Sequence, residues 1–180
     1  MMENTNKNLI TIYTDGACSY NRFKSSFGGW SFIIKFDNDL KEIHSAGFEK
    51  ETTSQRMELI SIINALEYIK EKLLTKNLSI IIYSDSQYAI KGASSWMYNW
   101  YDNNWMRIKN DKKLKINKKL QVKNLDLWKK IFELTKILKP KFIWIKGHSG
   151  NSYNELCDKL AVTALKMQSN YFTAIRMPSH

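Results

Sequence analysis

The sequence contains little cysteine and no long apolar run. Cys18 and Cys157 are its two cysteines among 180 residues, and neither lies in a CxxC or Cys/His ligand spacing. We therefore expect no disulfide framework and a reducing, cytoplasmic location. No apolar stretch approaches the roughly 20 residues that span a bilayer, and the polar segment 1–8 lacks the apolar core of a secretory signal. These absences predict a protein with no membrane partner.

Negative charge is also scarce relative to positive charge. The chain has 28 Lys and Arg against 17 Asp and Glu, which gives a formal net charge of +11 and a pI of about 9.5. Such a surface attracts polyanions, nucleic acid among them, although the same composition also serves ordinary solubility. Hydrophobic residues make up 43% of the chain, enough for the core of one domain. We expect a monomer by default.

The apolar pattern predicts alternating strands and helices. Strands are expected at 9–14, 30–36, 42–48, 78–83 and 141–146, and helices after a cap at 52–54 and at 86–98, 124–139 and 153–167. Residues 16–28 are expected to form a polar loop, and residues 102–124 a basic segment. The order βββ-α-β-α, basic segment, α-β-α implies a mixed sheet with helices packed against it.

Acidic residues follow two of the predicted strands. Asp15 and Asp85 each end an apolar run, so their carboxylates are expected at one edge of the core, where functional groups collect in α/β sheets. Asp85 could instead cap the next helix. Glu58 lies beside the apolar stripe of its helix. A salt bridge to Arg56 or a bound cation would each satisfy this carboxylate.

A fourth acid, Asp158, lies near the start of the last predicted helix, where the helix dipole alone would favour it. Clustered carboxylates repel one another and favour a hard cation with oxygen ligands, such as Mg²⁺. Two such ions can support in-line phosphoryl displacement. In a strongly basic protein, an acidic centre therefore predicts a polyanionic substrate that is bound by the basic surface and cut at the acids.

Seven motifs in order resemble those of type 1 ribonuclease H. They are YTDGAC (13–18), GGW (28–30), TTSQRMEL (52–59), SDSQY (84–88), NLDLW (124–128), WIKGHSG (144–150) and NELCDKLA (154–161). The resemblance implies an α/β ribonuclease H-like fold with a five-stranded mixed sheet, three strands antiparallel and two parallel. It implies a domain at 9–168 with a basic protrusion at about 96–124, between a disordered arm, 1–8, and a tail, 169–180.

The resemblance also implies an activity: hydrolysis of the RNA strand of an RNA–DNA hybrid, leaving 5′-phosphate and 3′-hydroxyl ends. Asp15, Glu58, Asp85 and Asp158 match the family's four metal-binding carboxylates, which would hold two Mg²⁺ ions when substrate is bound, and Mn²⁺ could substitute. His148 matches a histidine associated with proton transfer or product release. Without the motif, His148 would be interpreted as an exposed loop residue.

Further matches imply contacts to nucleic acid. Ser54, Gln55 and Gln87 would lie along the RNA strand, and Thr53 at a DNA phosphate. The remaining candidates are Cys18, Asn21, the tryptophans Trp96, Trp100 and Trp105, and the lysines Lys112, Lys113, Lys115, Lys118 and Lys119 of the protrusion. The alternative for the tryptophans is helix packing, and for the lysines a solvated loop.

The sequence departs from the family pattern in three places. The loop 19–26 has no Gly or Pro, Ser54-Gln55 stands where the family has an Asn pair, and lysines are added around 109–119. Other functions considered are a related nuclease or strand-transfer enzyme on the same fold, and a non-catalytic hybrid-binding module. Because all four acids are present, we favour the ribonuclease.

Overall fold

The computed structural model describes residues 8–20, 26–37, 41–73, 78–111 and 116–176. The strands are β1 (Asn8–Tyr20), β2 (Ser26–Phe36), β3 (Lys41–Lys50), β4 (Leu78–Ser84), β5 (Met106–Asp111), β6 (Ile116–Gln121), β7 (Lys141–Trp144) and β8 (Tyr171–Arg176). The helices are α1 (Ser54–Tyr68), α2 (Gln87–Lys91), α3 (Met97–Asp102), α4 (Leu125–Leu138) and α5 (Ser152–Met167). Two π-helical turns, Ile69–Leu73 and Gly92–Trp96, continue α1 and join α2 to α3.

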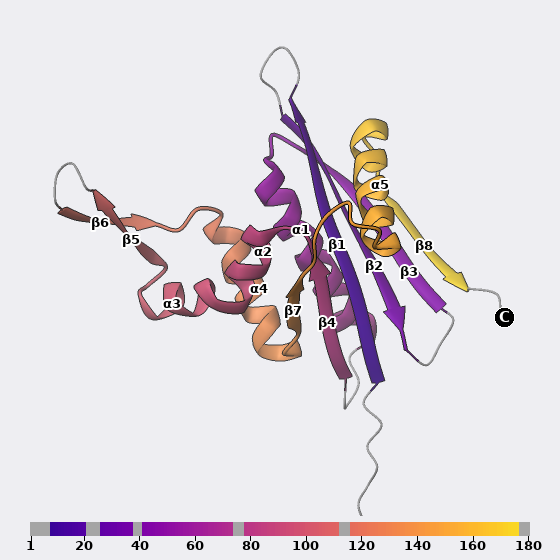
Figure 1. Ribbon diagram of the computed structural model, residues 1–180, viewed down its shortest axis with the longest axis horizontal. Coiled ribbons are helices and arrows are strands. Elements are labelled where there is room, and N and C mark those ends of the chain that lie inside the picture. The colour runs from indigo at the N-terminus through magenta and orange to yellow at the C-terminus, as the bar shows by residue number, and fades with distance from the viewer. Residues whose placement is uncertain (1–7, 21–25, 38–40, 74–77, 112–115, 177–180) are drawn as a thin grey trace, which may run out of the picture.

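The main sheet has the strand order β7-β4-β1-β2-β3-β8 (Figure 1). β1, β2 and β3 are antiparallel neighbours, and β4 and β7 extend the sheet in parallel with β1, as expected. The five-stranded prediction is wrong in one respect, because β8 adds a sixth strand against β3. Residues 171–176 therefore belong to the sheet and not to a separate tail.

The new edge strand is held by backbone and side-chain contacts. The Ser45 hydroxyl donates to the Tyr171 carbonyl at 3.2 Å, and the Asn170 side chain accepts from the Phe48 backbone N–H at 3.2 Å. The Phe172 ring lies 5.7 Å from that of Tyr68. β3 and β8 lie about 130 residues apart in the chain. Local hydrophobic periodicity cannot predict a pairing over that distance.

The two faces of the sheet are covered by different helices. Ile10, Ile12 and Phe32 belong to the core that includes α1 and α4. Alternate residues point the other way: the Ser31 hydroxyl donates to the Cys157 carbonyl of α5 at 2.7 Å, and the Cys157 thiol donates to the Tyr13 carbonyl at 3.3 Å. The sheet is therefore sandwiched between α5 and α1, as Figure 1 shows.

Two segments predicted as irregular are partly extended. β1 and β2 continue pairing through Tyr20 and Ser26, so most of the expected loop 16–28 forms a long hairpin. The basic segment contains the antiparallel pair β5 and β6, which projects away from the main sheet (Figure 1). The arm predicted at 1–8 lies outside the described residues, except that Asn8 begins β1.

None of the described helices is both long and apolar enough to cross a membrane.

Candidate active site

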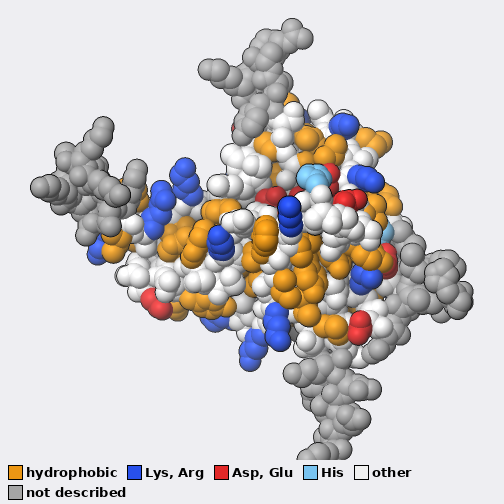
Figure 2. All heavy atoms as spheres, in the orientation of Figure 1, with side chains coloured by type: hydrophobic (Ala, Val, Ile, Leu, Met, Phe, Trp, Pro, Cys, Tyr) orange, Lys and Arg blue, Asp and Glu red, His pale blue; other side chains and the backbone are white. Residues whose placement is uncertain are grey.

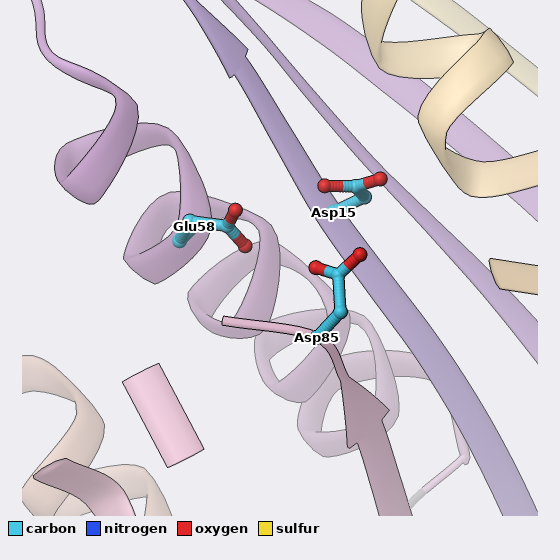
Figure 3. Close-up of side chains that lie close together, drawn as sticks. All are labelled: Asp15, Glu58 and Asp85. Carbon is cyan, nitrogen blue, oxygen red and sulfur yellow. The ribbon is translucent and has the colours of Figure 1, made fainter. Parts of the chain in front are cut away.

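Three predicted acids meet where β4 ends beside β1, although β1 itself continues past Asp15 to Tyr20. Asp15 lies on β1, Glu58 on α1 and Asp85 directly after β4, and one carboxylate oxygen of each lies within 4.8 Å of the others. Figure 3 shows the three carboxylates directed toward a common space. The parallel register pairs Tyr13 with Tyr83, so both aspartates follow at the same level of neighbouring strands.

Helix α1 can place Glu58 here because Gly16 follows Asp15. A Cβ atom at Gly16 would collide with the Glu58 backbone nitrogen, so a larger residue would push α1 away from β1. The helix begins after Thr53, whose hydroxyl accepts from the Arg56 backbone N–H at 3.3 Å. Glu58 therefore lies in the second turn, against the strand that carries Asp15.

The alternative partner of Glu58 is occupied elsewhere. The Arg56 guanidinium donates to both carboxylate oxygens of Asp126 on α4, at 3.1 and 2.8 Å. Within the described part of the chain, the buried Oε2 atom of Glu58 has no hydrogen-bond partner. A buried carboxylate oxygen without a partner is costly, so this oxygen fits a cation ligand better than a structural ion pair.

The electrostatics of the group favour a cation. Burial, followed by the charges of Asp85 and Asp158, raises the pKa of Asp15 from 3.8 to about 7, although the Gly16 backbone N–H donates to its Oδ1 atom at 2.7 Å. Burial, then Asp15 and Asp85, raises the pKa of Glu58 well above its usual value. A divalent ion would relieve both effects, because it offsets the repulsion and the lost hydration.

Asp85 is held by the end of β7 and the first turn of α5. The Trp144 indole N–H donates to its backbone carbonyl at 2.9 Å, and the Asn154 side-chain amide donates to its Oδ2 atom at 3.1 Å. A Cβ atom at Gly147 would lie 2.5 Å from the same Oδ2 atom. Asp85 does not cap α2, because the Ser86 hydroxyl does so by accepting from the Ala89 N–H at 3.3 Å.

Asp158 and His148 lie around this group. Asp158 is half-buried on α5 and outside the three-acid group, yet its charge contributes to the raised pKa of Asp15. His148 is exposed in the β7–α5 connection, with a left-handed φ of 49°. Figure 2 shows acidic side chains gathered near the middle of one face beside a histidine, with Lys and Arg along the projecting hairpin.

A cleft of about 330 Å³ lies between α2, the start of α3 and the base of the hairpin. Its lining residues are Gln55, Tyr88, Trp96, Trp100, Arg107, Val122 and Lys123. Gln55, Trp96 and Trp100 were predicted substrate contacts. Tyr88 was not predicted, although it ends the SDSQY motif. Its hydroxyl accepts from the Trp128 indole N–H at 2.9 Å and the Asn124 amide at 3.2 Å.

The other predicted contacts are dispersed. Trp105 packs edge-on against Phe132, with ring centroids 5.7 Å apart, as the helix-packing alternative proposed. Gln87 accepts a hydrogen bond from Lys91, and the half-buried Cys18 thiol lies 3.9 Å from the Thr52 carbonyl. Thr53, Ser54, Lys118 and Lys119 are exposed. Asn21, Lys112, Lys113 and Lys115 lie outside the described residues.

Known proteins share this sequence pattern and fold. The chain is 45% identical over 165 residues to a ribonuclease H of Treponema denticola, covering 86% of this chain and 96% of that protein. It is 42% identical over 161 residues to a ribonuclease H of Acetivibrio thermocellus, covering 89% and 97%.

Solved structures agree on the fold. LC9-RNase H1, a type 1 RNase H with the type 2 active-site motif, superimposes with a TM-score of 0.77 at 24% identity, covering 95% of this chain and 78% of that one. A foamy viral protease-reverse transcriptase in complex with RNA/DNA hybrid gives 0.69 at 17%, covering 89% and 20%. The RNase H family model matches residues 7–166. The chain therefore belongs to the ribonuclease H family, the hydrolases that cut the RNA strand of RNA–DNA hybrids.

Proposed function

We propose that this protein cuts the RNA strand of RNA–DNA hybrids at a centre of two Mg²⁺ ions held by Asp15, Glu58, Asp85 and Asp158. Family members use divalent metal ions, and the products would be 5′-phosphate and 3′-hydroxyl ends. The observation that carries the assignment of residues is the convergence of three carboxylates within 4.8 Å. The unpartnered Oε2 atom of Glu58 supports it independently.

The donor set suits a hard cation. Carboxylate oxygens, without sulfur or imidazole in the group of three, favour Mg²⁺, and Mn²⁺ is expected to substitute because it accepts the same ligands. When bound, two such ions supply an activated water and stabilise the leaving oxygen. By its match to the family motif, Asp15 would be shared by both ions, and Asp158 would help to hold the second ion from α5.

Each residue around the acids has a defined task in this proposal. Asn154 and Trp144 orient Asp85 through its side chain and its backbone carbonyl. Asp15 is oriented by the Gly16 backbone N–H. His148 is exposed and follows Gly147, which lies against Asp85, and its imidazole would take up the proton of the attacking water or deliver one to the leaving 3′-oxygen.

The substrate would lie across the acids and the cleft. Trp96 and Trp100 offer aromatic surface there, and Arg107 and Lys123 offer charge for the phosphates of one strand. The exposed Gln87 and Ser54 side chains are suited to 2′-hydroxyl groups, which distinguish RNA from DNA. Lys118 and Lys119 on β6 would contact phosphates further along the duplex. The two free cysteines fit a reducing, cytoplasmic location.

A cleavage assay on four matched, end-labelled substrates tests the proposal. RNA–DNA, RNA–RNA, DNA–DNA and single-stranded RNA would each be incubated with Mg²⁺, Mn²⁺ or EDTA. Asp15→Asn is the inactive variant, and Asp102→Asn, an exposed acid of α3, is the control for the change in charge. We expect metal-dependent cutting of the RNA strand in the hybrid alone, lost with Asp15→Asn and retained with Asp102→Asn.

Other results would point to the alternatives. Binding of the hybrid without cutting would indicate the non-catalytic module. Cutting of DNA–DNA would indicate a related nuclease on the same fold.

A further inference from the structure

A second polar cluster lies under the start of α5, apart from the three acids. Glu42 and His44 on β3 are only 5% and 6% exposed. The Glu42 Oε2 atom lies 3.0 Å from the His44 Nε2 atom, and its Oε1 atom accepts from the Tyr153 hydroxyl at 2.5 Å. Each oxygen of this buried carboxylate therefore has a partner, as burial of a polar group requires.

The Tyr153 side chain is held by three strands at once. Its ring stacks on Tyr13 of β1 at 5.2 Å, and the Lys35 ammonium of β2 lies 3.8 Å from its centroid. Glu42 of β3 accepts a hydrogen bond from its hydroxyl. Burial, and then the hydrogen bond to Glu42, raise the pKa of the Tyr153 hydroxyl, so it remains a donor at neutral pH. The first turn of α5 is thereby fixed over the sheet.

The residue after Tyr153 contacts the acidic group. Asn154 is 2% exposed, and its Nδ2 atom donates to the Asp85 Oδ2 atom at 3.1 Å. Its backbone N–H donates to the Asn151 side chain, which caps α5, at 3.1 Å. Consecutive helical residues point about 100° apart, so Tyr153 reaches the sheet while Asn154 reaches Asp85. A shift of this turn would move the amide relative to the carboxylate.

We propose that Glu42 and Tyr153 are positioning residues of the active site, which hold the first turn of α5 so that Asn154 orients Asp85. Neither residue lines the substrate cleft, so they act on the chemical step and not on binding of the hybrid. Misplacement of a reacting group by an ångström can cost as much as roughly 100-fold in rate. The kinetic part of this inference rests on the proposed function.

The test compares two variants that each remove one hydroxyl. Tyr153→Phe keeps the ring on Tyr13 and removes the hydroxyl, which donates to Glu42 and also interacts with the Lys35 side chain. The matched control is Ser45→Ala, which removes the Ser45–Tyr171 hydrogen bond from the same strand, away from α5. We expect Tyr153→Phe to lower kcat by about threefold to tenfold, the effect of weakening one charge-assisted hydrogen bond. KM for the hybrid stays within about twofold, and Ser45→Ala leaves kcat unchanged.

Two further measurements separate positioning from loss of stability. Glu42→Gln keeps an acceptor for Tyr153 and is expected to retain most of kcat, whereas Glu42→Leu is expected to behave like Tyr153→Phe. Thermal unfolding of every variant shows whether stability follows the same order. A positioning role predicts that kcat falls in the variants that lose the Tyr153–Glu42 hydrogen bond, whatever the order of their melting temperatures.

Calorimetric titration with Mn²⁺, in the absence of nucleic acid, tests the same geometry without turnover. We expect Mn²⁺ to bind Tyr153→Phe about threefold to tenfold more weakly than Ser45→Ala, because Asp85 is less well oriented. Equal Mn²⁺ affinity and equal kcat in these two variants would overturn the inference. If the wild-type protein fails to cut the hybrid, the proposed function fails, and the Mn²⁺ titration still decides the positioning role.

Discussion

Replacement of Asp15 by Asn is expected to stabilise the metal-free protein while abolishing cleavage. Asp15 is 7% exposed, and its pKa is raised from 3.8 to about 7, first by burial and then by Asp85 and Asp158. Asparagine has nearly the same shape, and its side-chain oxygen can still accept from the Gly16 N–H. The substitution therefore removes a charge that the folded protein disfavours and keeps the local hydrogen bond.

The direction of the pH dependence follows from proton binding. A carboxyl whose pKa is higher in the folded state binds more protons when folded, so its contribution to stability is fully present below about pH 4 and is lost as the pH rises through about 7. The pKa of Asp15 rises from 3.8 in the unfolded chain to about 7 in the folded protein. At about 1.4 kcal/mol per pKa unit, the charged carboxylate lowers the free energy of unfolding by about 4 kcal/mol at pH 8. For a chain of this size, removing that charge is a rise in Tm of roughly 8–16 °C.

The assay is thermal unfolding in EDTA at several pH values between 4 and 8, with Asp102→Asn as the control. Asp15→Asn should exceed the wild-type Tm at pH 8 and approach it near pH 4, while Asp102→Asn should follow the wild type. An unchanged Tm at pH 8, or a gain of the same size at both extremes, would refute the assignment of charge repulsion to this site.

Further expectations concern metal, backbone, charge and the sheet edge. Mg²⁺ should raise Tm more at pH 8 than at pH 5, because protons compete with the cation for the carboxylates. Gly147→Ala should lower kcat at least about tenfold, because its Cβ would meet Asp85 Oδ2 at 2.5 Å. The double variant Arg107→Ala/Lys123→Ala should bind the hybrid with a weaker salt dependence. The slope of log binding constant against log salt concentration should fall by about one for each phosphate that is no longer neutralised. Deleting 169–180 should lower Tm by a few degrees, because β8 covers the edge of β3.

Each of these expectations has an outcome that contradicts it. A pH-independent effect of Mg²⁺ would place the ion away from the raised carboxyls. Wild-type kcat in Gly147→Ala would mean that the β7–α5 connection adjusts freely, and an unchanged salt slope would exclude the cleft as a phosphate site. Melting at the wild-type temperature after the deletion would show that β8 adds nothing to the sheet.

Local pattern in the amino-acid sequence was enough to locate most of the elements. Alternating and helical periodicities located β1 to β4, α1, α4 and α5, because the spacing of apolar residues reflects the face that an element buries. The same pattern correctly placed Asp85 at the end of β4, but the strand that carries Asp15 continues past it to Tyr20. The parallel register of β1 and β4 then brings them together, as the family motifs implied.

The sixth strand, the partner of Arg56 and the Glu42–Tyr153 contact depend on residues far apart in the chain, and only the folded structure shows them. Residues 171–176 lack the alternation of apolar and polar residues that predicts a strand. The segment nevertheless pairs with β3, because the edge of that strand offers unpaired backbone groups. Arg56 pairs with Asp126, so the buried Oε2 atom of Glu58 has no hydrogen-bond partner among the described residues, although both acids are available in the sequence. The Glu42–Tyr153 contact spans 111 residues. Such pairings are set by packing of whole elements, which no local pattern encodes.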